Sequence, residues 1–148
     1  MSGNKNNNKI TGNLGEDIAV KYLKNKGFLI QNRNYTKKYG EIDIVARGTN
    51  VNDQTHVSYE TSDRIHFIEV KSVSYETKDQ LNWAVTHETW RPEEQVTAFK
   101  LNQIRKAGES WILENGWTGN VQIDVIAVRM VPREKYATVK YIPNVIAE

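Results

Sequence analysis

The sequence contains no cysteine, which excludes a disulfide scaffold, a cysteine-ligated zinc finger and a thiol nucleophile. It also lacks an apolar run near the roughly 20 residues that span a bilayer, and an N-terminal stretch with the basic-then-apolar layout of a signal peptide. We therefore expect a cytoplasmic protein with no membrane partner. With 148 residues, of which 39% are hydrophobic, the chain is long enough to bury a core.

The sequence also has no large excess of positive or negative charge, because the formal net charge is only +2. The charges are nevertheless unevenly distributed. Residues 1–40 carry eight Lys and Arg against two acids, whereas residues 41–98 carry five against eleven. Such a pattern is typical of a protein whose basic rim approaches phosphate while its acids hold cations. A solvated surface of uneven charge explains the same counts equally well.

Sequence patterns predict one domain of mixed secondary structure. Residues 1–10 are rich in Asn, Lys and Gly without apolar periodicity, so we expect a flexible N-terminal tail followed by a single domain over 11–148. Helical spacing and stop signals predict helices at 14–26 and about 93–115. Polar stretches at 48–63 and 74–92 are predicted loops. Strand patterns occur at 28–35, 41–47, 65–73, 121–131 and 137–142.

The order of these elements predicts an α/β fold. A strand, a crossover helix and a further strand make the third and fourth strands parallel. The first three strands are joined more tightly and suit an antiparallel meander. We therefore expect a mixed β-sheet with an α-β-β-β-α-β core, flanked by helices.

Charged residues recur on one face of two consecutive predicted strands. Side chains of a strand alternate between the faces of the sheet. Between residues 41 and 46, one face carries Glu41, Asp43 and Val45, and the other carries Ile42, Ile44 and Ala46. Between residues 66 and 71, one face carries Phe67, Glu69 and Lys71.

If a helix covers that face, placing the two carboxylates side by side is energetically unfavourable. A buried lone charge costs several kcal/mol, and Lys71 cannot neutralise both acids. A divalent cation can, and Mg²⁺ prefers carboxylate oxygens together with water and phosphate. Asp43 and Glu69, with Glu16 on the shoulder of the first helix, form a set of that type. The alternative is a surface ion-pair ladder, which is what a single Glu-x-Lys on a strand usually represents.

Two motifs make the comparison more specific. Gly40-Glu41-Ile42-Asp43, followed by Phe67-Ile68-Glu69-Val70-Lys71, resembles the PD-(D/E)xK nuclease signature. With Gly15-Glu16-Asp17-Ile18-Ala19, Asn34 and the strand around Asp124, the chain is similar to the YraN family over roughly residues 13–130. These are uncharacterised bacterial proteins of restriction-endonuclease-like fold, related to archaeal Holliday junction resolvases.

The resemblance implies a nuclease that hydrolyses phosphodiester bonds with Mg²⁺ or Mn²⁺. Asp43 and Glu69 would be metal ligands, and Glu16 a third ligand, directly or through water. Lys71 would orient the attacking water or stabilise charge on the phosphate. The analogy with resolvases favours DNA, branched or flapped, over RNA.

Other residues are candidates with an ordinary structural alternative. Phosphate contacts are plausible for a set of polar residues that could equally be solvated surface: Arg33, Lys37, Lys38, Gln95 and Lys100. Trp83 and Trp90 could stack on bases or pack a loop. Asp124 could be a strand-end acid or a support of the site.

Two rival functions stay open. The chain could be a nucleic-acid-binding or protein-interaction module that kept the fold without turnover, or a modification-system subunit that acts only with a partner. The sequence also leaves open whether the chain forms a homodimer.

Overall fold

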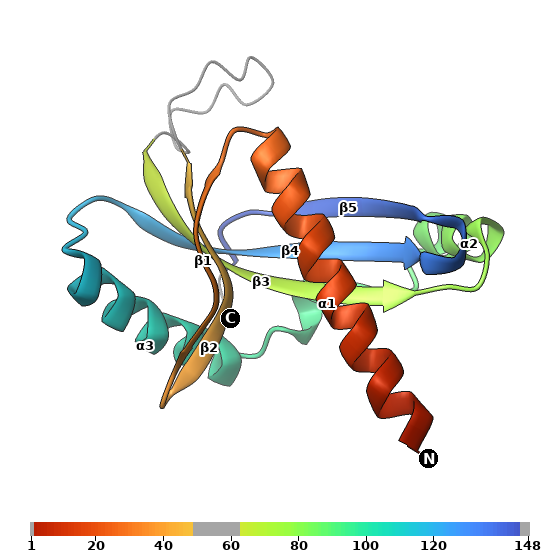
Figure 1. Cartoon of the computed structure of the whole chain (residues 1–148), viewed down its shortest axis with the longest axis horizontal. Helices are drawn as coiled ribbons and strands as arrows, with labels where there is room; N and C mark the ends of the chain where they lie inside the picture. Colours follow the sequence, from red (N-terminus) through yellow and green to blue (C-terminus); the bar gives the residue numbers. More distant parts are fainter. Residues whose placement is uncertain (1, 49–62, 146–148) are drawn as a thin grey trace.

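A computed structural model describes residues 2–48 and 63–145, with side chains from residue 9 onward. A five-stranded sheet runs in the order β1-β2-β3-β4-β5, with α1 across one face and α3 on the other (Figure 1). The strands are β1 Leu29–Lys37, β2 Gly40–Gly48, β3 Arg64–Ser74, β4 Val121–Val131 and β5 Tyr136–Ile142. The helices are α1 Ser2–Asn25, α2 Lys78–His87 and α3 Ala98–Asn115, with short 3-10 turns at Pro92–Gln95 and Pro132–Glu134.

The strand pairing confirms the predicted mixed sheet. β1 pairs with β2, and β2 with β3, in antiparallel fashion. β3 and β4 are parallel, and β5 adds an antiparallel edge. Of the predicted loop at 48–63, residues 49–62 lie outside the described part of the chain. No helix in the described residues is both long enough and apolar enough to cross a membrane.

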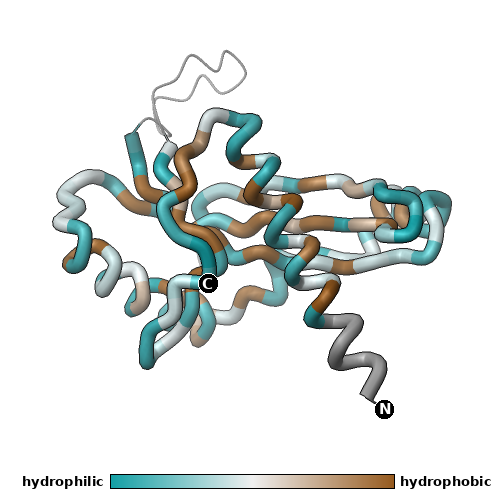
Figure 2. Tube along the Cα trace, in the orientation of Figure 1, coloured by the Kyte–Doolittle hydropathy of each residue, from teal (hydrophilic) through white to brown (hydrophobic). Residues whose placement is uncertain are grey.

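Each face of the sheet carries its own hydrophobic layer. Under α1, Leu23 packs with Ile44, Ile68 and Ile126. On the other face, Ile104, Ala107 and Trp111 of α3 pack with residues of the sheet, which are Ile42, Val45, Ile65 and Phe67. Hydrophobic stretches follow the central strands where α1 crosses them (Figure 2). Each fully buried side chain of this kind stabilises the fold by roughly 1.5–3 kcal/mol.

Glycines let both helices approach β3 closely. A Cβ added to Gly15 of α1 would lie 1.7 Å from Ser72 Oγ, and one added to Gly108 of α3 would lie 2.7 Å from the Phe67 ring. Because Ser72 and Phe67 belong to the same strand, both helices are seated directly against β3. This strand also carries Glu69 and Lys71.

The helix boundaries differ from the sequence-based expectation. α1 begins at Ser2, so residues 2–10, expected as a flexible tail, are assigned to a helix. Once a packed helix is nucleated, each added residue gains one backbone hydrogen bond at low cost. The expected second helix is divided, with a 3-10 turn at Pro92–Gln95 and α3 starting after the cap Thr97.

α2 occupies part of a stretch predicted to be a loop. Thr77 caps it by accepting a hydrogen bond from the backbone N–H of Gln80, at 3.1 Å. Only Leu81 and Ala84 of this helix are buried. Its apolar pattern was therefore too short to indicate a helix, although Thr77 followed by Gln80 is a helix-start signal.

The alternation predicted for β2 is wrong at Ile42. Ile44 packs under α1 as expected, but Ile42 packs with Val45 in the layer under α3. β2 pairs with β3 over Ile44–Gly48, while residues 40–43 continue beside β1. Residues 40–43 of β2 therefore twist away from β3. Ile42 is buried on the α3 side of the sheet as a result.

A polar network is buried on the α1 side of the sheet. Asp124 of β4 is fully buried and accepts hydrogen bonds from the Gln122 side chain, the Tyr141 hydroxyl and the backbone N–H of Asn144. His66 Nδ1 lies 2.6 Å from Asp124 Oδ2, the same oxygen that accepts from the Tyr141 hydroxyl. Asp124 thus joins β3, β4 and β5 through hydrogen bonds.

Candidate active site

Asp43 is held where β2 parts from β3. Its Oδ2 accepts a hydrogen bond from the backbone N–H of Val70 at 2.8 Å. The carboxylate thus satisfies a backbone donor of β3 beyond the last β2–β3 pair, Ile44 with Ile68. This bond fixes Asp43 beside the residue that precedes Val70, which is Glu69.

Glu69 and Lys71 project from β3 on the α3 side, as alternation predicts. Glu69 is 6% exposed. Its Oε1 lies 3.6 Å from Lys71 Nζ and 3.9 Å from Lys100 Nζ. Its Oε2 is buried and has no hydrogen-bond partner among the described residues. One oxygen of Glu69 is therefore shared by two ammonium groups, and the other is left unsatisfied.

Burial, followed by repulsion from the nearby Glu69 carboxylate, raises the pKa of Asp43 from 3.8 to about 7. The hydrogen bond from Val70 opposes this shift, while Glu16 and Glu41 add smaller repulsions. Near neutral pH, Asp43 is consequently divided between its neutral and charged forms. This is the electrostatic strain expected of two carboxylates forced together.

Glu16 belongs to a neighbouring arrangement. Its Oε1 lies 4.0 Å from an Arg33 guanidinium nitrogen. With its amide nitrogen turned toward the acids, Asn34 donates to Glu16 Oε1 at 3.0 Å and to Glu41 Oε1 at 3.1 Å. Burial raises the pKa of Glu16, and Arg33 opposes that shift.

The three predicted metal ligands do not form one cluster. Within residues 2–48 and 63–145, no three acidic or histidine side chains are grouped so that they could hold a metal ion. The structure brings Asp43 and Glu69 together and leaves Glu16 with Arg33 and Asn34. The sequence did not predict that Asn34 bridges Glu16 and Glu41. Asn34 adopts a left-handed backbone, with φ 51°, which Asn tolerates better than most residues.

Asp43 and Glu69 fit a hard divalent cation. Both supply carboxylate oxygens, the ligands such ions prefer, and Glu69 Oε2 is a buried oxygen in need of a partner. Glu93, in the turn before α3, is the other acid whose side chain has a buried, unpartnered oxygen in the described chain. The pair Asp43 and Glu69 is distinguished from Glu93 by the mutual repulsion that a cation would relieve.

The predicted phosphate contacts fall into three groups. Lys100 lies at the site beside Glu69. Arg33 and Lys37 are engaged elsewhere, because Arg33 donates to Asp17 at 2.8 Å and Lys37 pairs with Glu114. Lys38 and Gln95 are exposed, and neither has an ion pair or side-chain hydrogen bond in the described part of the chain.

Trp83 and Trp90, both expected in a loop, have different surroundings. Trp90 packs under the Arg129 guanidinium, 5.2 Å from its ring centroid, and its carbonyl accepts a hydrogen bond from the same side chain. Trp83 lies on α2, is 58% exposed and stacks on His87. Trp90 therefore has a packing role, and Trp83 remains available at the surface.

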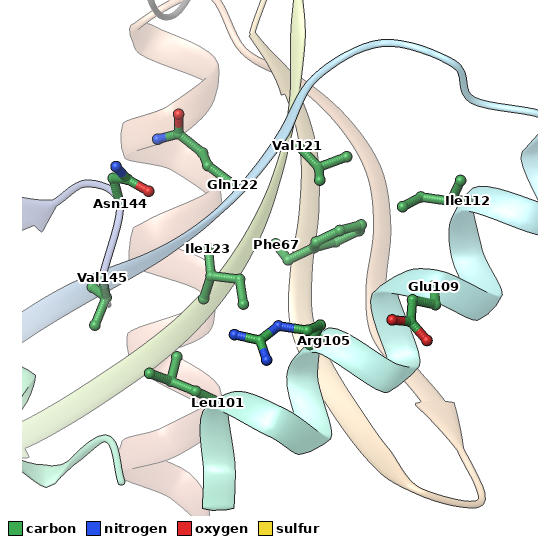
Figure 3. A pocket seen from close by; sticks show the side chains of 10 residues that line it. All are labelled: Phe67, Leu101, Arg105, Glu109, Ile112, Val121, Gln122, Ile123, Asn144 and Val145. Atoms are coloured by element: carbon green, nitrogen blue, oxygen red, sulfur yellow. The ribbon is translucent and has the colours of Figure 1, made fainter. Parts of the chain in front are cut away.

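A pocket lies between α3 and the start of β4 (Figure 3). This pocket, of about 400 Å³, is lined by Phe67, Leu101, Arg105, Glu109, Ile112, Val121, Gln122, Ile123, Asn144 and Val145. Arg105 extends from α3 toward Ile123 (Figure 3). None of the predicted site residues lines it, so the pocket is distinct from the Asp43–Glu69 pair.

The fold and the site define a mixed α/β domain in which one carboxylate of β2 and one of β3 repel each other, beside one lysine of β3 and one of α3. The chain belongs to the uncharacterised protein family UPF0102, whose model matches residues 15–128. This is the YraN family that the motifs indicated.

Relatives of similar length support this assignment. A UPF0102 protein of Dictyoglomus turgidum is 30% identical over 139 residues, covering 93% of this chain and 98% of the relative. One of Campylobacter jejuni is 34% identical over 120 residues, covering 81% and 84%. One of Campylobacter lari is 35% identical over 117 residues, covering 79% and 81%.

Proposed function

We propose that this chain is a divalent-metal-dependent nuclease that hydrolyses phosphodiester bonds in nucleic acid, with DNA as the favoured substrate. The observation that carries the proposal is the buried, unpartnered oxygen of Glu69 beside Asp43, whose pKa is raised to about 7. A buried carboxylate and a half-buried one that repel each other become stable neighbours when they share a divalent cation. The nuclease-like motifs point to phosphodiesters as the substrate class.

Asp43 and Glu69 would hold Mg²⁺ or Mn²⁺. Such an ion, when bound, supplies an acidified water and offsets charge that develops on the phosphate. Lys71, on the same face as Glu69, would orient the attacking water or stabilise the phosphate. Glu16, which stands apart from the pair, would act through water.

Cleavage assays test this proposal. Wild-type protein should cut labelled linear or branched DNA with Mg²⁺ or Mn²⁺, and EDTA should abolish cutting. Asp43→Asn and Lys71→Ala should each lower the rate by about 100-fold or more, with an unchanged circular dichroism spectrum. Glu109→Gln, which removes an exposed acid from α3, is the matched control and should cut normally. Equal rates for Asp43→Asn and wild type would refute the assignment.

A nucleic-acid-binding module without turnover is the second candidate. It is favoured by one observation, the separation of Glu16 from the Asp43–Glu69 pair in the described residues. Such a module would bind DNA with a steep salt dependence and would leave it intact with every divalent metal tested.

A further inference from the structure

Lys100 contacts the carboxylate that a cation would need. Its ammonium lies 3.9 Å from Glu69 Oε1, and that of Lys71 lies 3.6 Å from the same oxygen. Both separations exceed the usual hydrogen-bond length of about 2.7–3.2 Å. The two ammonium groups are therefore held at Glu69 by charge attraction, and they repel each other.

The two lysines differ in how they reach Glu69. Lys71 follows two residues later on β3, so the strand itself keeps it on the same face. Lys100 comes from the first turn of α3, where its backbone N–H donates to the Thr97 hydroxyl at 3.1 Å. Its backbone is fixed by that cap, but its side chain is 35% exposed and can turn toward solvent.

Binding of a divalent cation would affect the two lysines differently. When no divalent ion is present, the ammonium groups of Lys71 and Lys100 both face the Glu69 carboxylate. A further charge of +2 between the carboxylates would place like charges within a few ångströms of both ammonium groups. The side chain of Lys100 is 35% exposed against 29% for Lys71, and Lys71 is held on the same strand as Glu69, so the repulsion would fall on the contact of Lys100 with Glu69.

We propose that Lys100 is an exchangeable counter-ion: it neutralises Glu69 in the metal-free protein, and turns outward to a backbone phosphate of nucleic acid when a divalent cation binds. This inference rests on the proposed function. It couples the two binding events, because the phosphate contact of Lys100 becomes available only after the cation has taken its place. By linkage, nucleic acid must then strengthen metal binding by the same factor.

Metal titrations without nucleic acid test the first half. Wild type, Lys100→Gln and Lys106→Gln would be titrated with Mn²⁺ and with Ca²⁺ by calorimetry. Lys106 is exposed on the same helix, so its replacement removes an equal charge away from Glu69. We expect Lys100→Gln to bind metal roughly 3- to 10-fold more tightly than wild type, and Lys106→Gln to bind it as wild type does.

The salt dependence of DNA binding tests the second half. Binding to a short duplex would be measured over a salt series in Ca²⁺ and in EDTA. With Ca²⁺, the slope of log affinity against log salt should be shallower for Lys100→Gln than for wild type by about 0.9, the value of one phosphate contact. In EDTA the two slopes should agree. A merely structural role for Lys100 would not produce a difference that depends on metal.

The outcomes separate the two proposals. If wild type binds metal but Lys100→Gln binds it no more tightly, or if the slopes differ equally in EDTA, the exchange is refuted while the metal site stands. If wild type binds neither Mn²⁺ nor Ca²⁺, the metal site itself is refuted, and the role of Lys100 with it.

Discussion

Asp43 shows how one residue can serve structure and chemistry together. One of its oxygens completes the hydrogen bonding of β3 through the Val70 N–H. That bond favours the charged carboxylate, but burial and Glu69 favour the neutral form more strongly. A residue used only to satisfy Val70 would need no charge, so a titratable group in this position is costly to the metal-free fold.

Replacing Asp43 by Asn should flatten the pH dependence of stability in EDTA. The pKa of Asp43 is about 7 in the folded chain, against the usual 3.8. Between about pH 4 and 7 the folded state retains a proton that the unfolded chain has released. The wild-type free energy of unfolding should therefore fall as pH rises through this window, by up to about 4 kcal/mol. Asn keeps an oxygen for the Val70 N–H but does not titrate.

Urea unfolding at several pH values measures this effect. The difference between the wild-type and Asp43→Asn curves isolates Asp43 from the other titrating groups. The free energy of unfolding of Asp43→Asn relative to wild type should increase up to about pH 7 and then stay constant. Curves that stay parallel from pH 4 to 7 would show that the pKa of Asp43 is not raised.

At the scale of elements, the seating of α1 on β3 sets the position of Glu16. Gly15 precedes Glu16 and allows α1 to lie against Ser72, where an added Cβ would meet the Ser72 Cβ at 2.8 Å. Rotation of the Ser72 hydroxyl could relieve its own clash, but the Cβ contact remains. A larger residue at position 15 must therefore move the helix.

Gly15→Ala should destabilise the protein by roughly 1–3 kcal/mol, even though Ala normally favours a helix. Gly12→Ala is the matched control, because a Cβ there would meet nothing within 4 Å. That control should stabilise the chain by up to about 1 kcal/mol. Thermal or urea unfolding measures both variants, and equal stabilities for the two would contradict the close approach of α1 to β3.

Most elements could be predicted because their signals are local. Strand alternation placed Glu69 and Lys71 on the face that α3 covers, and the crossover correctly predicted the parallel pairing of β3 with β4. The twist that moves Ile42 could not be predicted, since it depends on where β2 parts from β3. The contact of Lys100 with Glu69 likewise depends on how α3 packs, which no local pattern specifies.

The whole molecule is tied together on its α1 side by the polar network around Asp124. Burial alone would raise the pKa of Asp124, but hydrogen bonds from His66, Asn144 and Tyr141 outweigh it and hold the pKa below its usual value. These partners come from β3, from β5 and from the segment after β5. The network therefore fixes the edge strand to the centre of the sheet.

Asp124→Asn should lower the free energy of unfolding by about 3 kcal/mol, because it leaves buried donors facing an amide. Tyr141→Phe removes a single donor and should cost about 1 kcal/mol. Urea unfolding measures both losses. Metal affinity should be unchanged in both variants, because His66 and Glu69 lie on opposite faces of β3. If Asp124→Asn were as stable as wild type, the proposed contribution of the network to stability would be contradicted.

The strand order also determines how the chain can assemble itself. Every strand lies beside its neighbour in sequence, and the parallel β3–β4 pair is the one that must wait for a long crossover, over residues 75–120, to close. Asp43 and Glu69 meet through the β2–β3 pairing, whereas Lys100 arrives with that crossover. The acidic half of the site is thus encoded in a contiguous meander. Lys71 comes with β3, whereas the second ammonium group, that of Lys100, reaches Glu69 only in the slower, non-local step of folding.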